Sequence, residues 1–246
     1  MHRFFADPFR SDTAHAYLTP DEARHALTVL RLKPSTRIEA ILDQRLWEAE
    51  IEDVSGHDVY IRLLRPLPSP EPELMITLYQ GLPKADKMDW IVQKATEIGI
   101  SRIVPLNMKR CVSHPDPKKD IRKLDRWRRI IHEACKQSGR CAIPEITEPV
   151  TLPDLVSQPG LPELNIVPWE EAEPGYGPRS FCSMHPSPAS LGILIGPEGG
   201  IDPSEIELLR EAGFSPITLG RRILRTETAG TAAAAAFLSL YGEMDR

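Results

Sequence analysis

The sequence predicts an α/β protein in which a mostly parallel sheet follows a small β-rich domain. From residue 74 onward, short apolar runs typical of buried strands alternate with amphipathic helical patterns. Before residue 70, three runs alternate apolar and polar positions or are rich in β-branched residues, as in a meander or small barrel. Four prolines within residues 66–72 predict a stiff linker between the two regions. We therefore expect one domain over residues 1–70 and a second over residues 73–246.

In the first domain we expect a strand from Arg3 and a short helix over residues 22–30, with Thr19 as its N-cap and Glu22 in the capping-box position. Three further strands are expected at 37–42, 47–54 and 58–64, separated by polar turns. Arg31 lies just beyond the helix, where it is either an ordinary surface arginine or a contact to RNA.

In the second domain, apolar runs alternate with helical patterns. The alanine run at 232–236 either reflects helix propensity alone or lets another element approach the last helix closely. Residues 170–188 are rich in Pro, Gly and Glu and are expected to form a surface loop. The expected strands are 74–80, 103–106, 164–167, 191–195 and 216–219, and the expected helices are 84–98, 118–138, 204–212 and 228–241.

Residues 195–200 (IGPEGG) form a loop between the fourth of these strands and a helix with clear start signals. Asp202 suits the N-cap, Pro203 the first helical position and Glu205 the capping box. Ligands of parallel sheets bind beyond the carboxyl ends of the strands, where glycines allow close approach. Because the loop carries Glu198 and no lysine, it suits a neutral or cationic ligand better than a polyphosphate. The alternative is a tight strand-to-helix turn that binds nothing.

Composition and charge indicate an ordinary globular protein with one basic segment. The chain of 246 residues is 41% hydrophobic and 26% charged, with a net charge of −5. Residues 84–140, however, hold 15 Lys and Arg against 7 Asp and Glu, so this segment is basic within an acidic protein. Such a segment, which includes the long helix at 118–138, is either an electrostatic footprint for RNA or a solvated helix face.

The cysteine spacing and the short apolar runs argue against a metal-binding, a secreted or a membrane-spanning protein. Four cysteines (111, 135, 141 and 182) show no metal-ligand spacing, so we expect reduced thiols and no metal. No secretory leader and no membrane-spanning segment are expected, because even the apolar run at 232–240 is far shorter than the ~20 residues that span a bilayer.

Several separated motifs together resemble the RsmE family of bacterial 16S ribosomal RNA methyltransferases, which make 3-methyluridine. The resemblance rests on residues 84–99 (KADKMDWIVQKATEIG), residues 133–140 (EACKQSGR) with Pro144 and Glu145, the loop IGPEGG, and residues 219–229 (LGRRILRTETA). The region around Arg31 is similar to the N-terminal domain of that family. The motifs span nearly the whole chain in the family's order.

This resemblance implies a fold, a cofactor and partners. The expected fold is a PUA-like β-barrel followed by a SPOUT domain with a deep trefoil knot, which binds S-adenosylmethionine. The expected protein is a cytoplasmic homodimer that methylates N3 of a uridine at the decoding site of 16S rRNA, in the assembled small ribosomal subunit, with no membrane and no metal.

The resemblance also assigns site residues. Arg3, Arg31, Lys84, Lys87, Lys94 and Arg140 are expected to contact RNA. The residues expected to bind the cofactor are Val167, Pro168, Ile195, Gly196, Pro197, Glu198, Gly199, Gly200, Leu219, Gly220, Ile223, Leu224, Arg225, Thr226, Thr228 and Ala229.

Arg225 and Glu227 are the candidate catalytic residues. The proton on uracil N3 is weakly acidic, so methylation needs a base or cationic stabilisation of the uracil anion. Arg225 suits the cation, since arginine stays charged and donates in a fork. Glu227 is either the base, a residue that orients Arg225, or a cap of the last helix. Glu198 either complements the positive charge of the cofactor or caps the turn.

Three other functions fit some of these residues. A non-catalytic RNA-binding protein would keep the barrel and the basic segment but bind no S-adenosylmethionine. A SPOUT enzyme acting on tRNA, or on the ribose 2′-hydroxyl, would use the same loops and differ in its product. A P-loop-like nucleotide hydrolase would bind ATP, which conflicts with Glu198 and the missing lysine.

Overall fold

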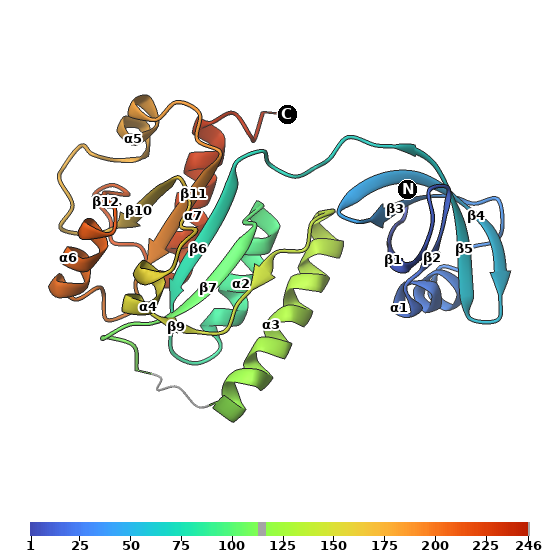
Figure 1. The fold of residues 1–246 in the computed structure, drawn as a ribbon, viewed down its shortest axis with the longest axis horizontal. Coiled ribbons are helices and arrows are strands. Elements are labelled where there is room, and N and C mark those ends of the chain that lie inside the picture. The colour runs from blue at the N-terminus through green and yellow to red at the C-terminus, as the bar shows by residue number, and fades with distance from the viewer. Residues whose placement is uncertain (113–116, 246) are drawn as a thin grey trace. The chain divides into compact units, whose positions relative to one another are not determined.

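The computed structural model describes residues 1–112 and 117–245, which divide into two compact units. The first unit holds Met1–Glu71 together with Cys135–Ile143, a segment that is distant along the chain. The second holds the rest of the described residues (Figure 1). No helix in the described part is long and apolar enough to cross a membrane.

The first unit is a closed five-stranded barrel with the strand order β1-β2-β5-β4-β3. Parallel pairing of β1 with β3, which places Phe4 opposite Ala40, closes it. Alternate side chains of each strand, among them Phe4, Ile38 and Ile61, fill a core that excludes water. The strands are β1 (Arg3–Ser11), β2 (His15–Leu18), β3 (Arg37–Leu42), β4 (Arg45–Ser55) and β5 (Asp58–Pro66).

The turn expected at Asp43 and Gln44 joins β3 to β4 as a two-residue hairpin, and both residues have positive φ, at 49° and 61°. This is the backbone of a type I′ turn, whose twist matches that of the flanking strands.

The expected helix at 22–30 differs in its start and its geometry. It begins earlier, as α1 (Pro20–Arg24), and continues as a π-helical turn over His25–Val29. The Thr19 side chain makes no cap hydrogen bond. Glu22 is 1% exposed and its carboxylate instead lies 2.9 Å from Lys136 Nζ, so the expected capping box is wrong. Burying a carboxylate without a cation costs more free energy than leaving a helix start without a second cap, so Glu22 pairs with Lys136.

The second unit is a parallel sheet of order β12-β10-β11-β6-β7-β8, with β9 paired to β7. Its strands are short and apolar, as expected for a sheet covered on both faces. The strands are β6 (Met75–Gly81), β7 (Arg102–Asn107), β8 (Glu145–Ile146), β9 (Val150–Thr151), β10 (Leu164–Pro168), β11 (Ser190–Ile195) and β12 (Phe214–Ile217).

Helices cover both faces of this sheet (Figure 1). Helices α4 and α6 pack on one face around Leu155 and Leu209, while α2 and α7 pack together on the other. The loops that follow β6, β7, β10, β11 and β12 leave the carboxyl edge of the sheet. The helices are α2 (Lys87–Ile98), α3 (Pro117–Ser138), α4 (Leu152–Ser157), α5 (Pro178–Met184), α6 (Pro203–Glu211) and α7 (Thr226–Leu240).

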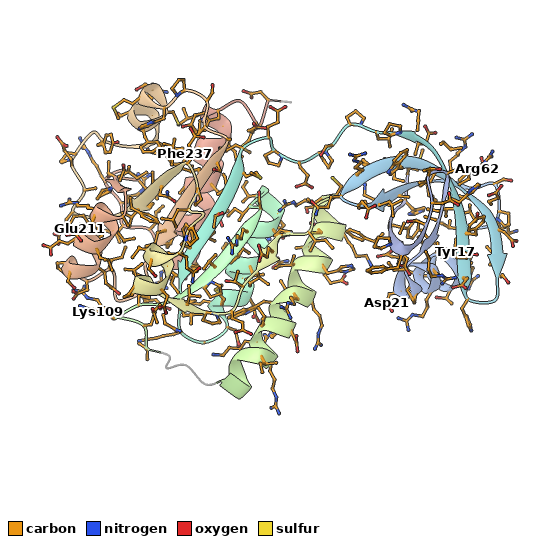
Figure 2. The ribbon with its side chains drawn as sticks, in the orientation of Figure 1. Tyr17, Asp21, Arg62, Lys109, Glu211 and Phe237 are labelled. Atoms are coloured by element: carbon orange, nitrogen blue, oxygen red, sulfur yellow. The ribbon has the colours of Figure 1, made fainter. Side chains whose placement is uncertain are left out.

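Two expectations for this unit need correction. The strand expected at 216–219 lies two residues earlier, because β12 pairs with β10 from Phe214 opposite Asn165. The expected loop at 170–188 contains the helix α5, which is anchored by the buried ring of Phe181 against Phe237 of α7. Figure 2 labels Phe237 among the side chains that fill the unit.

Candidate functional site

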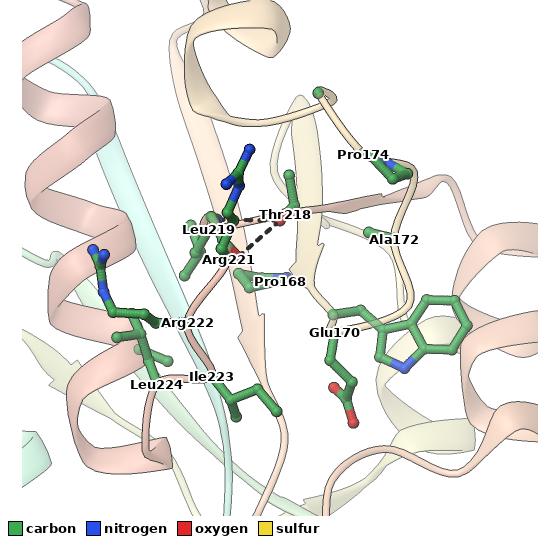
Figure 3. A pocket seen from close by; sticks show the side chains of 14 residues that line it. Pro168, Glu170, Ala172, Pro174, Thr218, Leu219, Arg221, Arg222, Ile223 and Leu224 are labelled. Atoms are coloured by element: carbon green, nitrogen blue, oxygen red, sulfur yellow. Dashed lines mark hydrogen bonds between the residues drawn. The ribbon is translucent and has the colours of Figure 1, made fainter.

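Two cavities adjoin each other at the carboxyl edge of the parallel sheet. The first, of about 600 Å³, lies between the loop after β10 and the loop after β12 (Figure 3). The second, of about 440 Å³, lies between the loop after β11 and the start of α7. Both volumes are within the range of small-molecule sites. Pro168, Glu170, Ile223, Leu224 and Ala229 line both cavities and form their shared wall.

The loop over residues 195–200, which we call the glycine loop, is held against its neighbours by buried hydrogen bonds. The Thr226 hydroxyl donates to the Gly196 carbonyl at 2.7 Å and accepts from Gln80 Nε2 at 2.9 Å. Gln80 is fully buried at the end of β6. A Cβ on Gly81 would stand 2.7 Å from the ring of Pro197, so only glycine lets β6 approach this loop so closely.

The far end of the glycine loop is fixed by α6 and by the loop after β7. The capping box expected at Asp202 and Glu205 is confirmed, with both of its hydrogen bonds present. Glu205 also accepts the backbone N–H of Lys109 at 2.9 Å, and the Lys109 ammonium donates to Ser204 (Lys109 is labelled in Figure 2). Arg110 Nη1 donates to the Gly199 carbonyl at 3.1 Å. Sequence reasoning missed Arg110, although its place after a parallel strand was a usable signal.

The second cavity is lined by three linked charges. Lys87 Nζ lies 2.9 Å from Glu198 Oε1 and 3.3 Å from Glu227 Oε2. The backbone N–H of Lys84 also donates to both oxygens of Glu198, at 3.1 and 3.2 Å. Burial raises the pKa of Glu198, but the bonds from Lys87 and from backbone N–H groups outweigh it and leave that pKa below its ordinary value. The hydrogen bond to Glu198 in turn raises the pKa of Lys87.

Arg225 stands at the N-cap position of α7 and lines the second cavity. Its backbone is extended (φ −67°, ψ 151°), and its carbonyl accepts the N–H groups of Thr228 and Ala229. Its guanidinium is exposed and forms no ion pair with any residue that the structure describes. A fixed backbone therefore presents an uncommitted cation at the mouth of this cavity.

The structure brings most of the residues expected to bind the cofactor into the two cavities. Two do not line them. Val167, in β10, is fully buried in the core, and Thr228, on α7, is exposed; neither lines a cavity. The expected residues that line a cavity are Pro168, Ile195, Gly196, Pro197, Glu198, Gly199, Gly200, Leu219, Gly220, Ile223, Leu224, Arg225, Thr226 and Ala229.

The six residues expected to contact RNA fall into different environments. Arg31 and Lys84 are exposed. Arg3 is bound to Glu39 and Lys94 to Glu97, both partly exposed. Arg140 is buried, at 6% exposed, and donates to Glu71 at 2.6 and 2.9 Å.

Lys87 lines the second cavity, where its ammonium is held between the carboxylates of Glu198 and Glu227. It is part of the site itself. Sequence reasoning also missed Glu170, which lies two residues after the end of β10 and lines both cavities. The carboxyl end of a parallel strand is the signal that could have found it.

The fold and the cavities together define a protein with a small barrel and a parallel sheet that carries two adjoining cavities at its carboxyl edge. Residues 70–238 match the model of the RNA methyltransferase domain, and residues 18–64 match that of the RNA methyltransferase PUA domain. The chain belongs to the RNA methyltransferase family, in the branch that contains the small-subunit methyltransferase E proteins, as the motifs of the sequence indicate.

The chain is similar to several proteins of this branch over nearly its whole length. It is 33% identical over 239 residues to ribosomal RNA small subunit methyltransferase E of Bacillus subtilis, covering 93% of each chain. It is 30% identical to the Aquifex aeolicus protein of the same name, covering 93% of this chain and 95% of that one. The crystal structure of the Neisseria gonorrhoeae protein of that name, bound to S-adenosylmethionine, superposes with a TM-score of 0.81 at 31% identity and 98% coverage of both chains. The expected fold class, a PUA-like barrel with a SPOUT-type parallel sheet, is confirmed.

Proposed function

We propose that this protein transfers a methyl group from S-adenosylmethionine to N3 of a uridine at the decoding site of 16S rRNA. The observation that carries the proposal is the pair of adjoining cavities with the uncommitted Arg225 at one of them. One cavity can hold the cofactor and the other the acceptor base, with the shared wall between them. The family, and the relatives named as ribosomal RNA small subunit methyltransferases, support a ribosomal RNA substrate.

The first cavity suits S-adenosylmethionine in its size and chemistry. Its wall is largely apolar, with Pro168, Leu219, Ile223 and Leu224, and its charged lining residues are Glu170, Arg221 and Arg222. Gly220 has a φ of +101° and open space beside its Cα, so a ligand can approach its backbone. When bound, the cofactor supplies a methyl carbon that its positively charged sulfur makes electrophilic.

The residues of the second cavity suit a uracil that must lose a proton. The uracil N3 proton has a pKa on the order of that of Tyr or Lys, so neutral uracil is a poor nucleophile at N3. We propose that Arg225 donates from its guanidinium to a uracil oxygen and stabilises the negative charge that develops there. Glu227, in the first turn of α7, is the candidate acceptor of the N3 proton. The alternative for Glu227 is to hold Lys87 and the start of α7 in place.

Because N3 lies on the Watson–Crick edge, the target uridine must be unpaired or flipped out before it reacts. Arg31, Lys84 and the exposed arginines of α3 are proposed to hold the RNA backbone. The proposal includes the further implications of the resemblance, namely a trefoil knot, a homodimer, the assembled small subunit as substrate, and activity in the cytoplasm.

The test is to map modified nucleosides in ribosomal RNA from a strain that lacks the gene. We expect one 3-methyluridine near the decoding site to be missing, and the purified protein with S-adenosylmethionine to restore it on small subunits. An unchanged 3-methyluridine would refute the assignment. A missing 2′-O-methyl nucleoside or a missing tRNA modification would instead identify one of the other SPOUT reactions. Failure to bind S-adenosylmethionine in calorimetry would favour a non-catalytic RNA-binding protein.

A further inference from the structure

The charges around the two cavities leave one carboxylate uncommitted. Glu198 was expected either to complement a cationic cofactor or to cap the turn, and its oxygens are bound by Lys87 and by the backbone N–H of Lys84. Glu227 also shares the Lys87 ammonium. Both carboxylates are therefore already paired with the same ammonium before any ligand arrives.

Glu170 differs from these two residues. It follows β10, lines both cavities and is exposed, and it forms no ion pair or side-chain hydrogen bond with the residues that the structure describes. Its Oε1 lies 3.4 Å from the point where a Cβ on Gly200 would stand, so the carboxylate reaches the glycine loop from the opposite wall. In Figure 3 the Glu170 carboxylate extends toward the end of the cavity where Ile223 lies.

The cations near Glu170 do not cancel its charge. Arg110 Nη1 approaches the same side of Gly200, at 3.7 Å from that Cβ position, but Arg110 is bound to the Gly199 carbonyl and lies 3.5 Å from Asp202. Arg221 and Arg222 line the first cavity on the loop after β12, and neither forms an ion pair with a described residue. A carboxylate that lines two cavities without an ion pair is a candidate group for binding a cationic ligand.

We propose that Glu170 is a specificity residue that recognises the positive charge at the sulfur of S-adenosylmethionine and so distinguishes the cofactor from its demethylated, neutral product. The inference rests on the proposed function. A carboxylate near the sulfonium attracts the cofactor by Coulomb energy but gains nothing from the neutral thioether of S-adenosylhomocysteine. Glu170 would thus favour cofactor entry and product release from the same site.

The test is calorimetric binding of three probes to the full-length protein and to Glu170→Gln. S-adenosylmethionine and sinefungin both carry a positive charge at or beside the reacting position, and S-adenosylhomocysteine does not. We expect Glu170→Gln to weaken binding of the first two by about fivefold and that of S-adenosylhomocysteine by less than about twofold. Glu171→Gln is the matched control, because Glu171 is the next residue, is exposed and lines neither cavity. It should leave all three affinities unchanged.

Two outcomes would overturn the inference while the proposed function stands. Unchanged affinities in Glu170→Gln would show that its charge does not act on the ligand. Equal weakening for all three probes would place Glu170 at the amino group that they share. If the wild-type protein binds none of the three probes, the proposed function itself fails. A circular-dichroism spectrum and melting temperature like those of Glu171→Gln would show that Glu170→Gln is folded.

Discussion

Lys87 Nζ lies 2.9 Å from Glu198 Oε1, so the first turn of α2 is joined to the glycine loop after β11. The same ammonium lies 3.3 Å from Glu227 in the first turn of α7. One lysine thus holds together three segments that are distant along the chain and keeps two carboxylates of one cavity from repelling each other.

Lys87→Met should therefore lower the melting temperature in a pH-dependent way. The pKa of Glu198 in the folded protein is below its ordinary value of 4.5, so its stabilising contribution is present above that value and is lost as pH falls through the folded pKa. We expect the difference in melting temperature between wild type and Lys87→Met to be largest near neutral pH and to shrink as the pH drops below about 4.5. Differential scanning calorimetry across this range is the measurement.

Lys94→Met is the control for this prediction, because Lys94 is on the same helix and forms an ion pair with Glu97, three residues further along that helix. A surface pair three residues apart contributes little. If Lys94→Met showed the same loss with the same pH dependence, the bridge through Lys87 would have no special role.

Thr226→Val should destabilise the second unit and loosen the glycine loop. Valine keeps the shape of threonine but leaves the Gly196 carbonyl and the Gln80 amide without the Thr226 hydroxyl in a buried place. A buried polar group without a partner costs about 1–3 kcal/mol, so we expect a loss of about 2 kcal/mol in the free energy of unfolding by urea. Affinity for S-adenosylmethionine should fall as well.

Thr231→Val provides the comparison on the same helix, since Thr231 forms no side-chain hydrogen bond with a described residue. It should change the free energy of unfolding by less than about 0.5 kcal/mol. An equal effect of both substitutions would mean that the loss comes from helix propensity and not from the buried hydrogen bonds.

Local signals in the sequence were sufficient for some of the site but not for its charges. The capping box at Asp202 and Glu205 spans four residues, so its pattern is complete in the sequence alone. The bridge from Lys87 to Glu198 joins residues more than 100 positions apart, and only the sheet order brings them together. Lys87 therefore seemed to be one more basic residue of a basic segment, and its role in the cavity could not be predicted.

The places of short elements and the exact strand boundaries also depend on residues that are distant along the chain. The strand β2 and the helix α5 are too short to produce a clear period, and their place is decided by pairing with β1 and by packing of Phe181 on Phe237. The boundaries of β12 follow its pairing with β10 and not its own apolar run. Arginine is a residue type that often contacts phosphate, but Arg140 is buried and donates to the carboxylate of Glu71, which lies 69 residues earlier in the chain.

Glu71→Gln should destabilise the first unit and so test the structural role of Arg140. Glu71 accepts two hydrogen bonds from Arg140 and the backbone N–H groups of Cys141 and Ala142, at 2.7 and 3.0 Å. Burial raises the pKa of Glu71, but the guanidinium and these N–H groups outweigh it and hold the pKa below 4.5. Breaking a buried pair from one side costs about 3–5 kcal/mol. We expect a loss near the lower end at pH 7, measured by urea unfolding, that shrinks below pH 4.5 as the pH falls through the folded pKa of Glu71 and the wild-type carboxylate becomes protonated.

The control for Glu71→Gln is Asp53→Asn, an exposed substitution in the same unit. Its effect should stay within about 0.5 kcal/mol at every pH. A loss in Glu71→Gln that persisted unchanged at low pH would show that packing, and not the ion pair, is what the substitution disturbs.

Arg225→Ala should lower turnover far more than it lowers cofactor affinity. The guanidinium is exposed at the second cavity and forms no ion pair with a described residue, so its removal costs the fold little. If Arg225 stabilises charge that develops on the uracil, kcat should fall about 100-fold, as for loss of one donor to a developing oxyanion, while the Kd for S-adenosylmethionine changes by less than about twofold. Arg225→Lys should recover part of the rate, because lysine keeps the charge but lacks the fork. Arg179→Ala, exposed on α5, is the control for the loss of one surface arginine. Equal losses in kcat and in affinity would make Arg225 a cofactor-binding residue, and the charge on the uracil would then need another cation of the same cavity.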